Sequence, residues 1–129
     1  MTFEQLEEFE KDLKSLKKKY RSLDEDLEVV KKILAVFPDQ RPPFSFRIDN
    51  LGIATCVIKI KKIACKALKG RGVNSGLRLI YAYFEEVIEV KEHDEIIQPY
   101  QAAKIIMVEL YHKKDKSTEN RERIRRYFR

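Results

Sequence analysis

Apolar residues at helical spacing occupy the first third of the chain. In residues 2–20 and again in residues 22–37 they recur every three or four positions, which is the pattern of a helix with one apolar face. Pro38 ends the second stretch, because the residue before a proline is pushed out of the helical region. The pattern therefore predicts an antiparallel helical hairpin over residues 2–37, whose apolar faces need a further surface to pack against.

The middle of the chain has the alternation of β-strands. Residues 44–48 predict a short edge strand, and residues 56–67 a second strand whose alternation changes phase near Lys61, so we expect a bulge or break there. Residues 77–84 are apolar on both faces, which is typical of a central strand. A last strand is predicted at residues 104–112.

These elements predict one α+β domain over residues 1–129. The helical hairpin would pack on a small antiparallel sheet within residues 44–112, followed by a short C-terminal helix over residues 117–128. Residues 85–98 are acidic, and we expect them to form an exposed excursion from the sheet.

Composition narrows the class of protein. A chain of 129 residues can bury a core without disulfide or metal. Cys56 and Cys65 have apolar neighbours and are expected to be reduced and buried. The acidic N-terminus does not resemble a signal peptide, and no stretch approaches the roughly 18 apolar residues of a membrane span. We therefore expect a cytoplasmic protein with no membrane partner.

The distribution of charge predicts a binding partner for the strand region. The formal net charge is +6, and residues 51–84 hold seven cations but no aspartate or glutamate. Nucleic acid is the expected partner, because cations that displace its condensed counterions gain affinity. The alternative is a solvated strand face whose lysines pair with acids elsewhere in the fold. The seven residues are Lys59, Lys61, Lys62, Lys66, Lys69, Arg71 and Arg78.

Arg78 and His93 each allow two interpretations. Arg78 lies mid-strand among apolar neighbours, where a guanidinium is costly to desolvate unless it pairs with an acid or faces a site. His93 lies between Glu92 and Asp94, but consecutive residues do not converge on one metal ion. We expect a solvated histidine and no metal site.

Two segments together resemble the RelE/ParE superfamily of bacterial toxin–antitoxin toxins, in particular the RelE/HigB-like mRNA interferases. They are KALKGRGVNSGLRLIYAYFEE and IIMVELYHKKDKSTENRERI. The matched features are a basic strand, a glycine loop ending in SGxR, an RLIY strand, and a late apolar strand ending in YHKxDK before a short helix. The helix FEKDLKSLKKKY is similar to the first helix of the family.

The resemblance implies cleavage of mRNA, often on the ribosome, and neutralisation by a co-encoded antitoxin in a hetero-oligomer. The arginine of SGxR is Arg78, and the basic residue after the last strand is Lys113 or Lys114. Family members usually open with a short strand, for which only Met1 and Thr2 precede the predicted helix. The family's C-terminal tyrosine has only Tyr127 as a weak counterpart, and the insert at residues 85–101 is long.

The chemistry of RNA cleavage assigns roles to these residues. Attack by the 2′-hydroxyl requires a base, cations for the pentavalent phosphorane and an acid for the 5′-oxygen, and it needs no metal or other cofactor. Arg78 would stabilise the transition state through its planar, bidentate charge. His112 can exchange a proton near neutral pH, although it could equally cap the end of its strand. Lys114 would supply charge or a proton, a role that Lys66 or Lys69 could also take.

The remaining candidates would bind the RNA chain. Tyr81 or Tyr111 could stack a base, since aromatic rings commonly hold unpaired RNA bases. The residues expected to contact phosphate are Lys62, Lys66, Lys69, Arg71 and Lys113.

Three functions follow from this site. The first is a metal-independent endoribonuclease toxin that inhibits translation. The second is a ParE-like toxin that poisons DNA gyrase without cutting RNA, and the third is a non-catalytic RNA-binding member of the family. The combination of Arg78, His112 and Lys114 favours the first, because gyrase poisoning does not require it.

Overall fold

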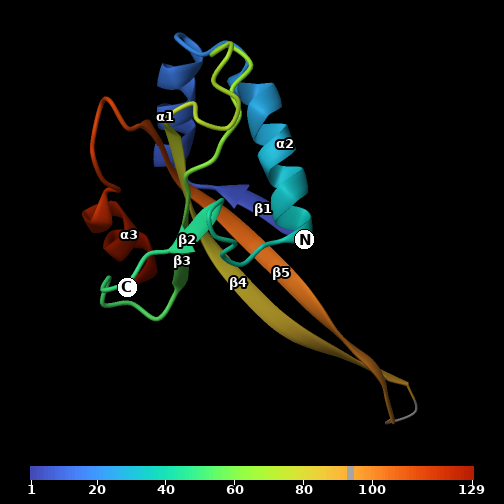
Figure 1. Cartoon of the computed structure of the whole chain (residues 1–129). Coiled ribbons are helices and arrows are strands. Elements are labelled where there is room, and N and C mark those ends of the chain that lie inside the picture. Colours follow the sequence, from blue (N-terminus) through green and yellow to red (C-terminus); the bar gives the residue numbers. More distant parts are fainter. Residues whose placement is uncertain (93–94) are drawn as a thin grey trace.

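The computed structural model describes the backbone of residues 1–92 and 95–129, and the side chains of residues 1–85 and 103–129. It confirms an α+β fold, with three helices and one five-stranded sheet in these residues (Figure 1). The elements in order are β1 (Thr2–Gln5), α1 (Glu7–Lys17), α2 (Leu23–Val36), β2 (Ser45–Arg47), β3 (Cys56–Ile60), β4 (Leu77–Glu92), β5 (Glu95–His112) and α3 (Arg121–Phe128).

The sheet is mixed, which corrects the prediction of an antiparallel sheet. Its strand order is β1-β5-β4-β3-β2, so β4 is central as predicted. The other pairs are antiparallel, but β1 runs parallel to β5, from Thr2 opposite Lys104 to Gln5 opposite Met107. The prediction of a helix from residue 2 was therefore wrong at its start, because pairing with a distant strand outweighs the local helical pattern.

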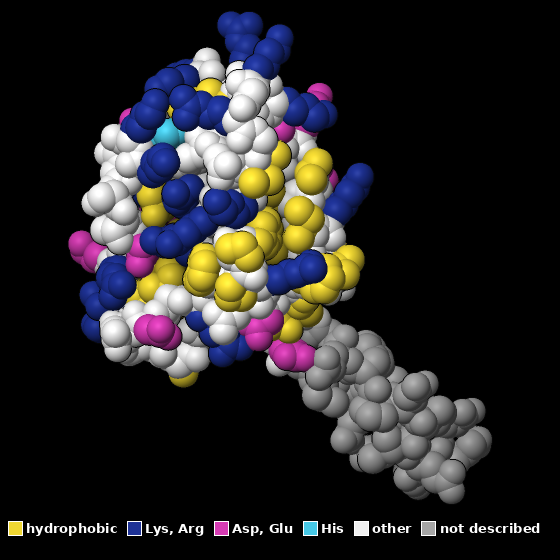
Figure 2. All heavy atoms as spheres, viewed as in Figure 1, with side chains coloured by type: hydrophobic (Ala, Val, Ile, Leu, Met, Phe, Trp, Pro, Cys, Tyr) yellow, Lys and Arg dark blue, Asp and Glu magenta, His cyan; other side chains and the backbone are white. Residues whose placement is uncertain are grey.

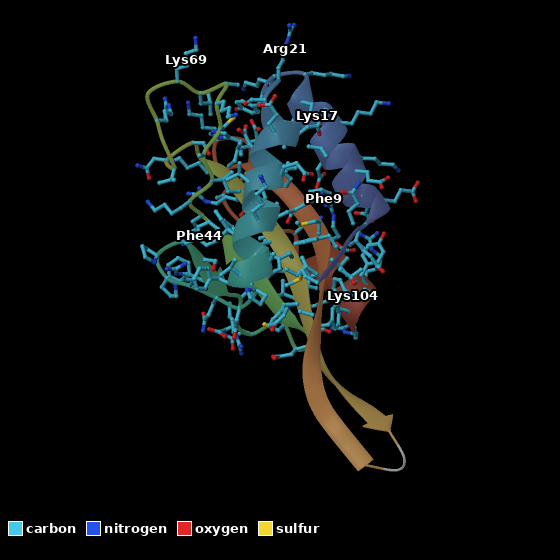
Figure 3. The ribbon with its side chains drawn as sticks, turned by 90° about the vertical axis from the view of Figure 1, so that its right-hand side faces the viewer. Phe9, Lys17, Arg21, Phe44, Lys69 and Lys104 are labelled. Carbon is cyan, nitrogen blue, oxygen red and sulfur yellow. The ribbon has the colours of Figure 1, made fainter. Side chains whose placement is uncertain are left out.

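The core lies on both faces of the sheet. On one face, Leu79 and Tyr81 of β4 are buried in a cluster that includes Phe9 of α1 and Leu27 of α2. On the other face, the intervening β4 residues pack in a cluster with Ile124 of α3. Figures 1 and 3 show the same division, with α1 and α2 on one side of the strands and α3 on the other. We call these the hairpin face and the α3 face.

The phase change predicted near Lys61 is a break, as expected; it lies in residues 51–84, which hold the seven cations and which we call the basic segment. β3 ends at Ile60, and Ile63 then forms an isolated bridge with Asn74. This arrangement lets Ile60, Ile63 and Cys65 all reach the cluster on the hairpin face. Residues 61–76 form the loop from β3 to β4.

Residues 85–92 and 95–103 extend β4 and β5 beyond the predicted strand ends. They pair from Glu85 opposite Ala103 to Glu92 opposite Glu95, in a two-stranded ribbon that projects from the body (Figure 1). The expectation for His93 lies outside the described residues. Among the helices described, none is long and apolar enough to cross a membrane.

Helix α3 starts later than predicted and is tied to α1 and β5. Its N-cap is Asn120, whose side chain accepts a hydrogen bond from the Arg123 amide. Arg123 Nη1 donates to Asp12 Oδ2 at 2.7 Å and to the Val108 carbonyl at 3.0 Å. The same Asp12 oxygen accepts from the Leu110 amide at 3.1 Å. A single carboxylate therefore joins α1, β5 and α3.

Asp12→Ala should lower the free energy of unfolding by about 1–3 kcal/mol, because it leaves the amide and guanidinium donors of this network without their acceptor. Asp24→Ala is the matched control. Among the described side chains Asp24 pairs with Lys17 alone, and it is 61% exposed, so its loss should cost less than about 1 kcal/mol. Urea unfolding of both variants measures the difference, and equal losses would contradict the proposed anchoring of α3.

Candidate nucleic-acid interface

Among the described side chains, two cations of the basic segment have acid partners. Lys59 Nζ lies 2.7 Å from Glu119 Oε2, and the two side chains are 16% and 3% exposed. Lys66 Nζ lies 3.1 Å from Glu25 Oε2, but both side chains are about two-thirds exposed or more. A buried pair of this kind fixes structure, whereas an exposed pair is weak and can exchange for phosphate. The alternative that the strand lysines pair with acids elsewhere in the fold therefore applies to Lys59. Lys66 also has an acid partner, but that exposed pair is weak.

Buried carboxylates anchor the segment between β5 and α3 over the sheet. Burial acts to raise the pKa of Glu119, but hydrogen bonds from Lys59, its own backbone and Thr118 outweigh it and lower that pKa to about 2. Glu109, which is 1% exposed, pairs with Lys116 and accepts from the Asn120 amide at 2.8 Å. Both carboxylates are thus engaged within the protein and leave other nearby cations unneutralised.

Five cations lie at the ends of β3, β4 and β5. Arg78 Nη1 donates to the Lys61 carbonyl at 3.1 Å, and Lys62 Nζ donates to Asn74 Oδ1 at 2.9 Å. The Lys113 amide donates to the Gly76 carbonyl at 2.9 Å. Among the ion pairs of the described residues, none involves these five side chains. This strand-end cluster consists of Lys61, Lys62, Arg78, Lys113 and Lys114.

Arg78 is the best placed of the five to hold a phosphate. It lies on the α3 face, and its strand register places it opposite Tyr111 of β5. Its Nη1 donates to two carbonyls, while its Nε and Nη2 have no acceptor among the described residues. A guanidinium oriented by the backbone with free donors is suited to bidentate binding of an oxyanion. Figure 2, viewed as in Figure 1, shows dark blue side chains gathered over the upper left and centre of the molecule, with apolar side chains toward the right.

His112 is not brought to Arg78, which corrects the grouping of these two residues. His112 lies opposite Leu77 in the register, so its side chain points to the hairpin face. The ring is 4% exposed and stacks on Tyr20 with centroids 5.8 Å apart. Its Nδ1 accepts from the Lys114 amide at 3.1 Å, and its Nε2 lies 2.9 Å from the Ser75 carbonyl. These contacts give His112 the strand-capping role that the sequence left open.

Gly76 shows how closely the loop approaches the His112 ring. Gly76 has φ of +89°, and a Cβ built on it would lie 2.6 Å from His112 Nε2. Both the backbone conformation and the space therefore require glycine. The loop end and the histidine form one packed unit, with no room for a substrate between them.

The two tyrosines expected to stack a base are also held within the protein. Tyr81 is fully buried on the hairpin face, its hydroxyl donates to the Pro38 carbonyl at 2.7 Å, and burial raises its pKa. Tyr111 is 6% exposed, with Lys116 Nζ 5.0 Å from its ring centroid. Inward alternation on a central strand explains the burial of Tyr81.

Phe46 is an aromatic residue near the cluster that the sequence analysis missed. It is partly exposed on edge strand β2, and Lys61 Nζ lies 5.0 Å from its ring centroid. It lines a cavity of about 210 Å³ together with Lys59, Lys61, Glu119 and others. The alternation of residues 44–48 predicted the strand, but only its pairing with β3, Phe46 opposite Lys59, places this ring beside the basic segment.

The remaining expected RNA contacts lie in the loop from β3 to β4. Lys69 and Arg71 are exposed, and Lys66 is fixed beside α2 by its amide, which donates to Asp26 Oδ1 at 3.2 Å. Figure 3 shows Lys69 and Arg21 pointing away from the body at the same end of the molecule. This loop extends the basic surface past the end of the sheet.

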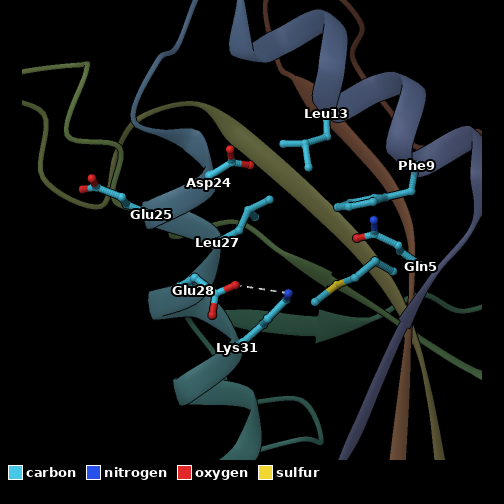
Figure 4. A pocket seen from close by; sticks show the side chains of 9 residues that line it. Gln5, Phe9, Leu13, Asp24, Glu25, Leu27, Glu28 and Lys31 are labelled. Atoms are coloured by element: carbon cyan, nitrogen blue, oxygen red, sulfur yellow. Dashed lines mark hydrogen bonds and ion pairs between the residues drawn. The ribbon is translucent and has the colours of Figure 1, made fainter.

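A hollow between α1 and α2 has a different character. It has a volume of about 380 Å³ and is lined by apolar residues and by three carboxylates, of which Glu28 pairs with Lys31 at 3.3 Å (Figure 4). These carboxylates would repel phosphate. Among the described residues, no three histidine, cysteine or acidic side chains gather in a way that could hold a metal ion.

Comparisons with protein-family models, curated proteins and solved structures found no match to this chain. The resemblance to RelE/ParE toxins rests on the sequence segments alone.

The ion pair of Glu119 should make stability depend on acid pH. Because its pKa falls from 4.5 to about 2 on folding, it contributes stability that is fully present above about pH 5 and is lost as the pH falls toward 2. That contribution is about 3 kcal/mol. Glu119→Gln should therefore flatten the fall in unfolding free energy across this range. Glu122→Gln, at an exposed position of α3, should leave the fall unchanged. Equal slopes in both variants, from urea unfolding at several pH values, would refute the assignment.

Proposed function

We propose that this protein binds single-stranded RNA through the strand-end cluster, and that it is a toxin of a toxin–antitoxin system which cleaves mRNA. The observation that carries the proposal is the set of five cations without acid partners in the described structure, at the ends of three neighbouring strands. Such a set gains free energy by replacing condensed counterions on a polyphosphate.

The scissile phosphate would bind at Arg78. Its free Nε and Nη2 donors would hold two oxygens of the phosphate, and Lys61 and Lys62 would lie toward the neighbouring nucleotides. These charges would favour the pentavalent phosphorane over the ground state, because the negative charge on the reacting oxygens grows as the bond forms. Phe46 offers a partly exposed ring on which an unpaired base can stack.

We assign proton transfer to the lysines of the strand-end cluster. Both ring nitrogens of His112 are engaged inside the protein, so this residue acts by holding the Lys114 amide and the Ser75 carbonyl. Lys114 is exposed beside it and would protonate the departing 5′-oxygen, while a solvent water would take the proton of the attacking 2′-hydroxyl. This assignment replaces the earlier one of His112 as acid or base.

A second candidate is RNA binding without cleavage. The burial of His112 favours it, because the site then lacks an imidazole for proton transfer. The proposed partners are the same in both cases: mRNA, on the ribosome or free, and a co-encoded antitoxin protein.

Binding of a fluorescent single-stranded RNA should weaken with salt. If the five cations contact phosphates, the log–log slope should be about −3 to −4. The double variant Lys61→Ala/Arg78→Ala should reduce the magnitude of that slope by about 1.4, since two phosphate contacts are lost. Lys11→Ala/Lys14→Ala, which removes two exposed cations of α1, should leave the slope unchanged. Equal effects of the two variants, measured by anisotropy over a range of salt concentrations, would place the RNA elsewhere.

Measurement of RNA cleavage distinguishes the ribonuclease from the non-catalytic RNA-binding protein. Arg78→Ala should lower the single-turnover rate on programmed ribosomes by about 100- to 1000-fold, as is usual for loss of one oxyanion donor. Arg78→Lys should recover little, because a point charge does not reproduce the bidentate fork. If the wild-type protein binds RNA with the expected slope but cuts none, the non-catalytic candidate is correct. If Arg78→Ala is folded and equally active, the phosphate does not bind at Arg78.

A further inference from the structure

An apolar surface lies on the second half of α2 and the segment that follows it. Val36, Val29 and Phe37 are 67%, 48% and 43% exposed, which is unusual for large apolar residues so close together. With Ile33 and Phe44 they line a cavity of about 470 Å³. We call this surface the α2 groove; its other lining residues are Lys32 and Arg41.

The groove has fixed walls. The Phe37 amide donates to the Ile33 carbonyl at 2.8 Å, and the Tyr81 hydroxyl donates to the Pro38 carbonyl at 2.7 Å. The Arg41 amide donates to Ser45 Oγ at 2.8 Å, and the Ser45 amide returns a bond to the Arg41 carbonyl at 3.1 Å. The apolar side chains are thus held open on a pre-formed surface, which lowers the entropy lost when a partner binds.

The groove has the shape expected for a helical partner. Val29, Ile33 and Val36 lie at positions i, i+4 and i+7 of α2, so they form a straight stripe along the helix. This stripe is separate from the buried residues of α2, such as Leu27 and Leu34, which pack on the sheet. A stripe of this spacing packs against the ridge of a second helix.

The charges of the α2 groove indicate that its partner helix is acidic. The two charged residues of the groove are both cations, and neither Lys32 nor Arg41 forms an ion pair among the described residues. The Arg41 guanidinium lies 3.7 Å from the Phe37 ring centroid, at the mouth of the groove. A two-fold contact with a second copy would bring these cations close to their own equivalents, which is unfavourable. An acidic partner would meet both cations with opposite charge.

We propose that the α2 groove binds an amphipathic helical segment of a partner protein, with apolar side chains at i, i+4 and i+7 and acidic residues beside them. The groove adjoins the strand-end cluster at one point, because the Lys61 amide donates to the Phe44 carbonyl at 3.0 Å, but none of the five cations of the cluster lines it. Figure 3 shows Phe44 beside α2. The inference does not depend on RNA binding.

The test uses two synthetic helical peptides about 18 residues long, which is about five turns. Both carry leucine at i, i+4 and i+7, and one has glutamate and the other lysine at the flanking positions. Nuclear magnetic resonance titration of the full chain should show amide shifts within residues 29–44. The glutamate peptide should bind about 10-fold more tightly than the lysine peptide. Lys32→Glu/Arg41→Glu should reverse this order.

A matched pair of valine variants tests the apolar contribution. Val36→Ser should weaken binding of the glutamate peptide by about 10-fold. Val73→Ser removes a valine that is 48% exposed in the loop from β3 to β4, and it should have no effect. Two results would overturn the proposal: shifts confined to the strand-end cluster and insensitive to Val36→Ser, or sedimentation that shows a dimer abolished by Val36→Ser.

Discussion

Burial of β4 on both faces is the constraint on which the rest of the structure depends. Leu79 and Tyr81 on one face and Ile80 and Ala82 on the other are all fully buried. Such a strand requires a cover on each side of the sheet, because exposing either set would return a large apolar area to water. The helices α1 and α2 cover the hairpin face. The α3 face is covered by a helix of only eight residues, Arg121–Phe128, and by the segment that leads into it.

Two buried carboxylates hold the short cover of the α3 face in place. Glu109 and Glu119 fix the segment before α3, and each takes a cation of its own, Lys116 and Lys59. Buried ion pairs contribute modestly to stability but fix the position of the groups they join. These pairs also affect the charge of the surface, because the two carboxylates point into the protein and leave other nearby cations unneutralised. The strand-end cluster beyond them keeps its charge, and Arg78 is oriented there by backbone carbonyls.

Local periodicity predicted the elements whose type is decided by residues close together in the sequence. The central strand, the second helix and the break after Ile60 all follow from spacing within a short stretch. Strand β1 was missed because Phe3 and Leu6 fit the apolar face of a helix equally well. Its strand conformation is decided by pairing with β5, about one hundred residues away in the sequence. The face on which a residue lies depends on strand register, which also shifts between Ile80 and Tyr81. Sequence alone therefore could not separate Arg78 from His112, nor pair Lys59 with Glu119.

The proposed site for RNA phosphate lies on the α3 side of the strand ends, at Arg78. The most direct measurement follows the Arg78 Nε–H signal and the backbone amides by nuclear magnetic resonance while a short single-stranded RNA is added to the intact protein. If phosphate binds at Arg78, the Arg78 signal and the amides of Lys61, Lys62 and Lys113 should shift along one saturation curve. Shifts concentrated at Lys18, Lys19 and Arg21, with the Arg78 signal unchanged, would contradict it.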